Sequence, residues 1–199
     1  MSHSIKGLLI VSVFIIISSC RAENADAANS VTVRLYSDVQ LSTQTLAQAE
    51  QEAGRIFRQA GIEIVWVQCK PSSSPTDPRC AFPPASKLLA MRIVLKALNA
   101  ADSIFGMAFL SQEGQGAYGD VFYKSVETLH QQCNASVPRV LGHVMAHELG
   151  HLLLGSNAHT EIGIMRSHWF SEQLRAVDRG TLFFSPEQAR LIRNRLRTV

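Results

Sequence analysis

Residues 137–154 read VPRVLGHVMAHELGHLLL, a long and mostly apolar segment with helical signals at both ends. Ser136 precedes it and is a residue type that caps helix N-termini, while Pro138 suits the first turn. Gly155 follows it, and glycine is common just past the end of a helix. We therefore predict a single helix over 137–154, whose apolar side chains pack in a core.

The middle of this helix carries ionisable side chains in the order His147-Glu148-Leu149-Gly150-His151. Because residues i and i+4 project from the same helical face, His147 and His151 can both bind one metal ion. Glu148 then lies beside the metal, where a carboxylate can take a proton from a bound water molecule. The pattern predicts one catalytic Zn²⁺ held by His147 and His151, with Glu148 as the general base.

A catalytic zinc site needs a third protein ligand and one open position. The leading candidate is His159, because Gly155 lets the chain turn back toward the metal, and Met165 follows in the same segment. Residues 147–165 thus resemble the metzincin zinc metalloproteases, whose motif H-E-x-x-H-x-x-G-x-x-H precedes a Met-turn. The resemblance implies that His159 completes the zinc site and that Met165 forms a hydrophobic floor beneath the metal.

The spacing after the second histidine of the helix departs from the metzincin motif. Leu154 occupies the expected glycine position and Asn157 the expected histidine position. Gly155 and His159 therefore come one and two residues late. A helix that is one residue longer, with a wider turn after it, would still bring His159 to the metal.

Three other residues are alternatives for the third ligand: Glu172, His168 and His143. Glu172 lies 21 residues after His151, as in the gluzincin branch, where a glutamate from a later helix completes the site. His168 is followed by Trp and Phe, which indicate a packed surface rather than a ligand. His143 lies one helical turn before the pair, so we interpret it as a supporting residue displaced along the axis from the ion.

Shorter sequence patterns predict further strands and helices, which together indicate an α+β fold. Alternating apolar residues predict five strands, over Val31–Tyr36, Ile62–Gln68, Leu89–Leu95, Ser103–Leu110 and Ala117–Tyr123. Apolar residues three and four apart predict a helix over Ser42–Gln59, and a capping box that starts at Ser185 begins a C-terminal helix. The resemblance implies a zincin-like fold, with a twisted, mainly mixed β-sheet, the long active-site helix and the C-terminal helix. It also implies that strand 117–123 is an exposed edge that pairs with an extended peptide. An ordinary sheet strand is the alternative.

The N-terminus predicts export. Lys6 and the apolar run Leu8–Ile17 are typical of a secretory signal peptide, and the run is too short for an ordinary transmembrane helix. An uncleaved anchor is the alternative. Ala25-Asp26-Ala27 offers a cleavage site, so we predict a signal peptide over 1–27 and a single catalytic domain over 28–199.

The chain has 4 cysteines, and the predicted export determines which roles we expect for them. Residues 17–20, ISSC, resemble a bacterial lipobox, so lipidation of Cys20 is an alternative to simple secretion. In an oxidising environment Cys69 and Cys80 are predicted to form a disulfide that closes the Pro/Ser-rich loop between them. Cys133 is then left without an assigned partner.

Composition excludes several classes of protein. The 199 residues are 46% hydrophobic and 18% charged, with a net charge of +3, which is too apolar for a disordered chain. The arginines of the C-terminal helix have no accompanying aromatic residues for base stacking, so no nucleic-acid partner is expected. We expect a monomer that touches a membrane only through a lipid anchor.

These observations predict a secreted, periplasmic or cell-surface zinc endopeptidase, which hydrolyses a peptide or protein substrate with metal-activated water. Two alternatives stay open: a non-enzymatic binding protein on a zincin scaffold, and a zinc amidase acting on cell-wall or other non-protein amides. Glu148 argues against the first alternative, because a structural metal site has no use for a base. The sequence does not separate the amidase from the peptidase.

Overall fold

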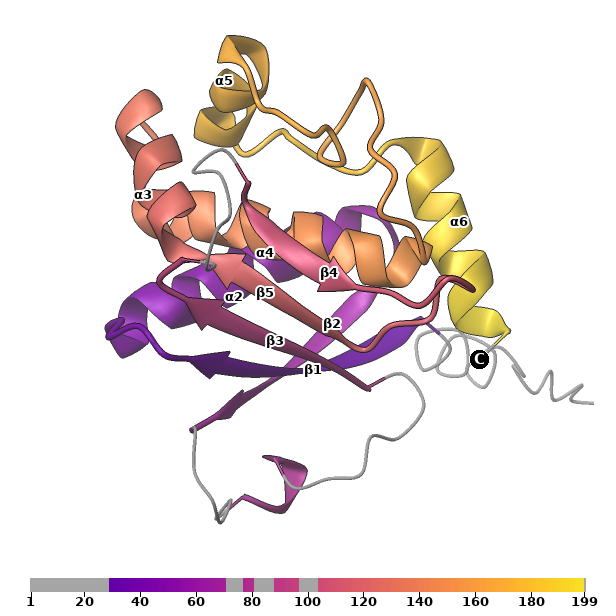
Figure 1. Cartoon of the computed structure of the whole chain (residues 1–199). Helices are drawn as coiled ribbons and strands as arrows, with labels where there is room; N and C mark the ends of the chain where they lie inside the picture. The colour runs from indigo at the N-terminus through magenta and orange to yellow at the C-terminus, as the bar shows by residue number, and fades with distance from the viewer. Residues whose placement is uncertain (1–28, 71–76, 81–87, 97–103, 199) are drawn as a thin grey trace, which may run out of the picture.

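The structure, a computed structural model, describes residues 29–70, 77–80, 88–96 and 104–198 (Figure 1). The signal peptide expected over 1–27, with Cys20 as its lipidation alternative, lies outside these residues and stays a prediction. Within the described ranges, no helix has the length and apolar character that crossing a membrane requires.

Five strands form one mixed sheet with the order β2-β1-β3-β5-β4. The strands are β1 (Ser30–Ser37), β2 (Glu63–Cys69), β3 (Leu88–Val94), β4 (Gly106–Phe109) and β5 (Tyr118–Phe122). Neighbouring strands run parallel, except that β4 runs antiparallel to β5. The five predicted strands are therefore confirmed, with ends that differ by a few residues. Ser103, where the fourth was predicted to begin, lies outside the described residues.

The free edge of the sheet near the long helix is β4, and not the strand predicted over 117–123. β5 pairs with β3 on one side and with β4 on the other, so both of its backbone edges are occupied. A turn at Gly114, which has a φ of 72°, folds β4 back onto β5. The expectation that 117–123 is an exposed edge is therefore wrong, because a short hairpin strand covers it.

Two long helices, α2 (Thr43–Gln59) and α4 (Val137–Leu154), pack against each other and lie on the same face of the sheet (Figure 1). Both follow the sequence patterns. Ser42 caps α2, because its hydroxyl accepts a hydrogen bond from Thr45 N at 3.0 Å. Gly155 ends α4 in the left-handed conformation, with a φ of 66°.

Three shorter helices complete the fold: α3 (Tyr123–Gln132), α5 (Ser171–Arg179) and α6 (Pro186–Arg197). α6 begins at the predicted capping box, in which the side chains of Ser185 and Gln188 accept from each other's backbone N–H groups. The sequence predicts neither α3 nor α5. Phe122 and Phe170 stand at their N-caps, and phenylalanine carries no capping signal. Tyr123, which the sequence assigns to a strand, is instead the first residue of α3.

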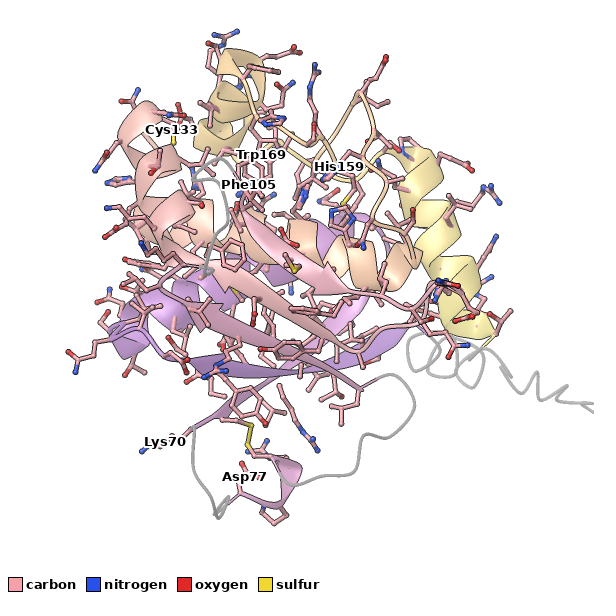
Figure 2. All side chains as sticks on the ribbon, in the orientation of Figure 1. Lys70, Asp77, Phe105, Cys133, His159 and Trp169 are labelled. Carbon is pink, nitrogen blue, oxygen red and sulfur yellow. A yellow bond between two sulfur atoms is a disulfide. The ribbon has the colours of Figure 1, made fainter. Side chains whose placement is uncertain are left out.

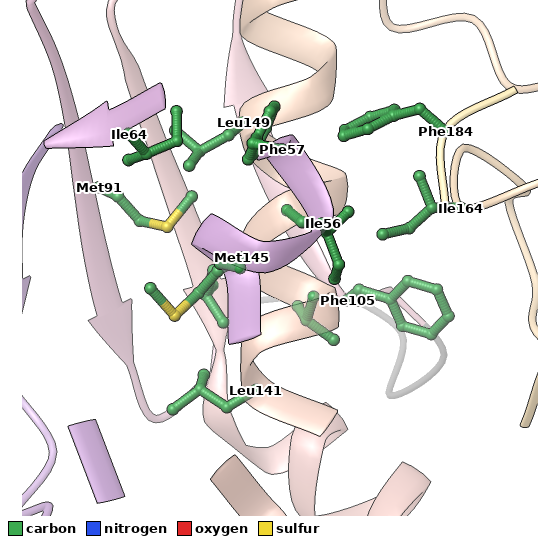
Figure 3. Packing of buried hydrophobic residues seen from close by; sticks show 14 of the residues in the cluster. Ile56, Phe57, Ile64, Met91, Phe105, Leu141, Met145, Leu149, Ile164 and Phe184 are labelled. Atoms are coloured by element: carbon green, nitrogen blue, oxygen red, sulfur yellow. The ribbon is translucent and has the colours of Figure 1, made fainter. Parts of the chain in front are cut away.

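Helix α4 lies at the centre of the hydrophobic core. Every residue from Val140 to Leu153 is buried. Figure 3 shows Met145 and Leu149 of α4 among apolar side chains that come from the sheet and from α2, including Phe57. Because protein cores are close-packed, this burial holds the side chains of α4 in fixed orientations. The predicted buried helix over 137–154 is thus confirmed.

The predicted disulfide is present in the structure. Cys69, the last residue of β2, is bonded to Cys80 in the short 3₁₀ helix η1 (Pro78–Cys80), with the Cα atoms 5.8 Å apart (Figure 2). Cys133 is a free thiol that is half-buried. The bridge therefore fastens η1 to the end of an outer strand of the sheet.

Candidate metal centre

Hydrogen bonds fix the imidazole rings of His147 and His151. His147 Nδ1 donates to Ile164 O at 2.7 Å, and His151 Nδ1 donates to Ser156 O at 2.8 Å. A backbone carbonyl oxygen only accepts hydrogen bonds, so each Nδ1 carries the ring hydrogen. Burial lowers the pKa of both imidazoles, so the rings are neutral and each Nε2 is an unprotonated acceptor, which is the form that binds a metal ion.

The two Nε2 atoms of His147 and His151 face each other at 3.1 Å. With both atoms unprotonated no hydrogen bond joins them, and their lone pairs repel unless a cation lies between them. A tetrahedral zinc ion, with Zn–N bonds of about 2.0–2.1 Å, separates two ligand nitrogens by roughly 3.3 Å. The donor pair therefore fits a metal ion of this size.

The loop after α4 brings His159 to this pair. Ser156 is held at its carbonyl oxygen by His151, and its hydroxyl accepts a hydrogen bond from Ala158 N at 3.1 Å. The potential ligand atoms of His147, His151 and His159 all lie within 4.8 Å of one another. In Figure 2, His159 lies on the loop above α4. The wider spacing in the sequence thus still delivers a third imidazole.

The three alternative ligands do not join this cluster. Glu172 is an exposed residue of α5, and His168 is exposed in the preceding loop. His143 is fully buried one turn before His147, and its Nδ1 donates to a backbone oxygen of its own helix at 2.8 Å. Among the described residues, the group of histidine, cysteine and carboxylate side chains that can hold a metal is His147, His151 and His159. That these three bind zinc stays a prediction.

Burial keeps the histidines of the cluster uncharged. It lowers the pKa of His147 to about 3, and it also lowers the pKa values of His151 and His159. The neutral imidazole is the metal-binding form. The cluster is therefore in its metal-binding protonation state at neutral pH.

Glu148 lies in the wall of a cavity of about 260 Å³ that opens at the three histidines. The residue is 3% exposed, and burial raises the pKa of its carboxyl group to about 8. Strand β4 approaches it closely, since a Cβ atom on Gly106 would lie 2.7 Å from Glu148 Cγ. A buried carboxyl group in the wall of a cavity, next to a metal-binding cluster, is placed where it can exchange a proton with a molecule in that cavity.

The remaining walls of this cavity come from two parts of the chain. One is the segment 104–108, which includes most of β4. The other consists of polar residues from the loops after α4: Asn157, Ser167 and His168. The cavity therefore lies between the free edge strand of the sheet and the loops that carry His159 and His168.

Two aromatic residues that the sequence does not single out as functional support His147. The rings of Phe105 and Trp169 lie side by side (Figure 2), with their centres 4.7 Å apart. Both pack edge-on against the His147 imidazole, at 5.6 and 6.0 Å. Trp169 Nε1 also donates to Ile164 O at 3.2 Å, the same oxygen that accepts from His147. Only the apolar character of Trp169 and its neighbour in the sequence indicates such packing, and Phe105 carries no comparable signal.

Met165 packs directly behind the histidine pair. It is fully buried, and a Cβ atom on Gly150 would lie 2.5 Å from Met165 Sδ. Gly150 stands on α4 between His147 and His151. The methionine thus lies against the turn of the helix that carries both imidazoles. That Met165 forms a hydrophobic floor beneath a metal stays a prediction.

Gly150→Ala is expected to destabilise the fold by about 1–3 kcal/mol, because the added methyl group overlaps the buried sulfur of Met165. Gly54→Ala is the matched control within a helix. Its Cβ meets only the tip of the flexible Arg58 side chain at 3.3 Å and Trp66 Nε1 at 3.8 Å. Helix propensity predicts an unchanged or higher stability for the control, by up to about 1 kcal/mol. Urea denaturation measures both, and a neutral Gly150→Ala would contradict the close packing.

Buried His143 is expected to make stability depend on pH. Burial lowers its pKa from 6.5 to about 4, so between these values the unfolded chain binds a proton that the folded chain does not. Its contribution is complete above about pH 6.5 and is lost as the pH falls toward 4. Burial also lowers the pKa of His147, so this residue likewise reduces the stability of the folded protein as the pH falls. The metal-free His143→Leu variant should therefore lose less stability than the wild type between pH 7 and pH 4.5 in urea denaturation. Equal losses would exclude this role.

Comparison with known proteins relates the fold to two solved structures. No protein-family model and no curated protein matches this sequence. Archaemetzincin from Methanopyrus kandleri is 17% identical, with a TM-score of 0.50 over 84% of this chain and 96% of that one. A zinc-dependent peptidase from Methanocorpusculum labreanum is 15% identical, with a TM-score of 0.53 over 80% and 99%. At these identities the likeness establishes the fold alone, and it confirms the predicted zincin-like α+β architecture.

Proposed function

We propose that this protein is a zinc-dependent endopeptidase. The observation that carries the proposal is the pair of unprotonated Nε2 atoms of His147 and His151, 3.1 Å apart, with His159 beside them and Glu148 in the same cavity. Neither Nε2 has a hydrogen to donate to the other, so the two imidazoles cannot hydrogen-bond to each other. Their arrangement instead suits binding of a tetrahedral cation. Two proteins that share the fold, an archaemetzincin and a zinc-dependent peptidase, support this choice of metal and activity.

The residues of the cavity would divide the reaction between them. Zinc held by His147, His151 and His159 would supply a water molecule of lowered pKa and polarise the carbonyl group of the scissile amide. Glu148 would take one proton from the attacking water and deliver it to the amide nitrogen as the C–N bond breaks. The buried hydrogen bond from His147 Nδ1 to Ile164 O would keep the imidazole in the tautomer that binds a metal.

An extended substrate would pair with β4. Within the part of the chain that the structure describes, this strand pairs with β5 alone, and its residues line the cavity beside Glu148. A peptide that adds to the free edge of a sheet gains backbone hydrogen bonds without regard to its side chains. We therefore propose that the peptide backbone binds along Gly106–Phe109, with the scissile amide in the cavity.

The choice between enzyme and binding protein depends on Glu148. A structural zinc site normally closes with four protein ligands, whereas the cluster here offers three and a buried carboxyl group beside them. This arrangement favours catalysis. Export to the cell surface or beyond is part of the proposal, and the Cys69–Cys80 disulfide supports it, because such bonds persist in oxidising compartments.

Metal removal tests the proposed function. The purified protein is expected to contain one zinc ion per chain and to hydrolyse a fluorogenic casein. Treatment with 1,10-phenanthroline should abolish this hydrolysis, and one equivalent of Zn²⁺ should restore it. Hydrolysis that survives complete loss of zinc would refute the proposal. Cleavage of a cell-wall amide, with no cleavage of any protein or peptide, would favour the amidase instead.

A further inference from the structure

The cavity at the metal centre contains polar side chains that neither the ligands nor the base account for. They are Asn157, Ser167 and His168. His168 is outside the three-histidine cluster, so its imidazole is not engaged there. A nitrogen donor that faces a hydrolytic cavity without belonging to its metal site can instead serve the substrate.

The residue that follows His168 is held close to His147 by buried contacts. The following residue, Trp169, is 5% exposed, and its Nε1 donates to Ile164 O at 3.2 Å. Ile164 O also accepts from His147 Nδ1, so one carbonyl oxygen holds both a proposed ligand and the residue beside His168. Phe105 packs on the Trp169 ring at 4.7 Å. His168 is therefore carried by a segment whose position relative to the histidine cluster is set by buried contacts.

The neighbouring hydroxyl group is compatible with the tautomer of His168 that carries its ring hydrogen on Nε2. Ser167 Oγ lies 3.2 Å from His168 Nδ1. When the hydroxyl group donates to Nδ1, the ring hydrogen resides on Nε2, which then becomes a donor. The ring is exposed at the cavity, where a substrate oxygen can accept from it.

We propose that His168 is a further catalytic residue, whose Nε2–H donates a hydrogen bond to the carbonyl oxygen of the scissile amide; this inference rests on the proposed function. When the water oxygen bonds to the carbonyl carbon, the π electron pair moves to the carbonyl oxygen and one water proton passes to Glu148. The donor stabilises the negative charge on that oxygen. The C–N bond then breaks, the proton passes from Glu148 to the nitrogen, and a carboxylic acid and an amine leave.

Kinetics of three variants of the zinc-loaded protein test the proposal: His168→Ala, His168→Gln and Glu172→Gln. Loss of one such donor lowers kcat by about 100-fold or more, so we expect this result for His168→Ala with a quenched fluorescent peptide, at nearly unchanged KM and one zinc per chain. His168→Gln should recover part of the loss, because its amide keeps an N–H donor. Glu172→Gln, exposed on α5 and outside the cavity, is the matched control and should equal the wild type.

A binding measurement provides a readout that is independent of turnover. A phosphinic peptide carries a tetrahedral, charged group in place of the scissile amide, and calorimetry should show that His168→Ala binds it at least about tenfold more weakly than Glu172→Gln does. Wild-type kcat and wild-type phosphinate affinity in His168→Ala would overturn this inference alone. Loss of zinc from His168→Ala would also overturn it, by making His168 a ligand. A wild type that binds zinc but cleaves no peptide would overturn the proposed function and this inference together.

Discussion

Glu148→Gln is expected to lower kcat for peptide hydrolysis by about 10³-fold, because it removes the group proposed to take the proton from the attacking water. The amide is nearly the same size as the carboxyl group, so the close contact with β4 at Gly106 is kept. The three histidines are untouched, and zinc content should stay at one per chain. Steady-state kinetics with metal analysis of the same samples measures both quantities.

The same variant is expected to be more stable than the wild type at alkaline pH when metal is absent. Burial raises the pKa of Glu148 from 4.5 to about 8 in the folded protein. Between these values the unfolded chain releases a proton that the folded chain retains, so wild-type stability falls as the pH rises from 4.5 toward 8. Glu148→Gln escapes this loss. A variant that is inactive and also less stable at pH 8 would point to misfolding, and full activity would refute the assigned base.

His159→Ala is expected to weaken zinc affinity by about 10²- to 10³-fold, since each ligand of a zinc site contributes roughly 3–4 kcal/mol of the binding free energy. His159 is exposed, whereas His147 and His151 are buried. Truncating it should therefore leave the fold intact, and the melting temperature of the metal-free protein should not change. Competition with a chromophoric zinc chelator measures the affinity.

Glu172→Gln separates the two candidate third ligands in the same assay. It should bind zinc as tightly as the wild type, because Glu172 lies on the surface of α5 and outside the histidine cluster. The opposite pattern, with full affinity in His159→Ala and weak binding in Glu172→Gln, would return the ligand role to Glu172. Peptide hydrolysis by His159→Ala should recover in part when excess zinc is added.

Local signals account for the elements that the sequence predicts, and their absence accounts for those that it misses. Each of α2, α4 and α6 follows a serine at its N-cap position and carries apolar residues at helical spacing. The start of each helix can therefore be predicted from the local sequence. α3 and α5 begin after phenylalanine and are short, and their helical state depends on packing against α4. The free edge is missed for a related reason. Whether β4 or β5 lies outermost depends on strand pairing rather than on either strand's composition.

The amino-acid sequence is enough to predict the long helix and the relation among His147, Glu148 and His151, because helical periodicity places residues four apart on one face. It is also enough to predict the pairing of Cys69 with Cys80 across a short loop. The three-dimensional structure is needed to see that His159, and not Glu172, reaches the histidine pair, and that Phe105 and Trp169 pack against His147. These contacts join segments whose distance along the chain says nothing about their distance in space, so they exist only once the core around α4 has formed.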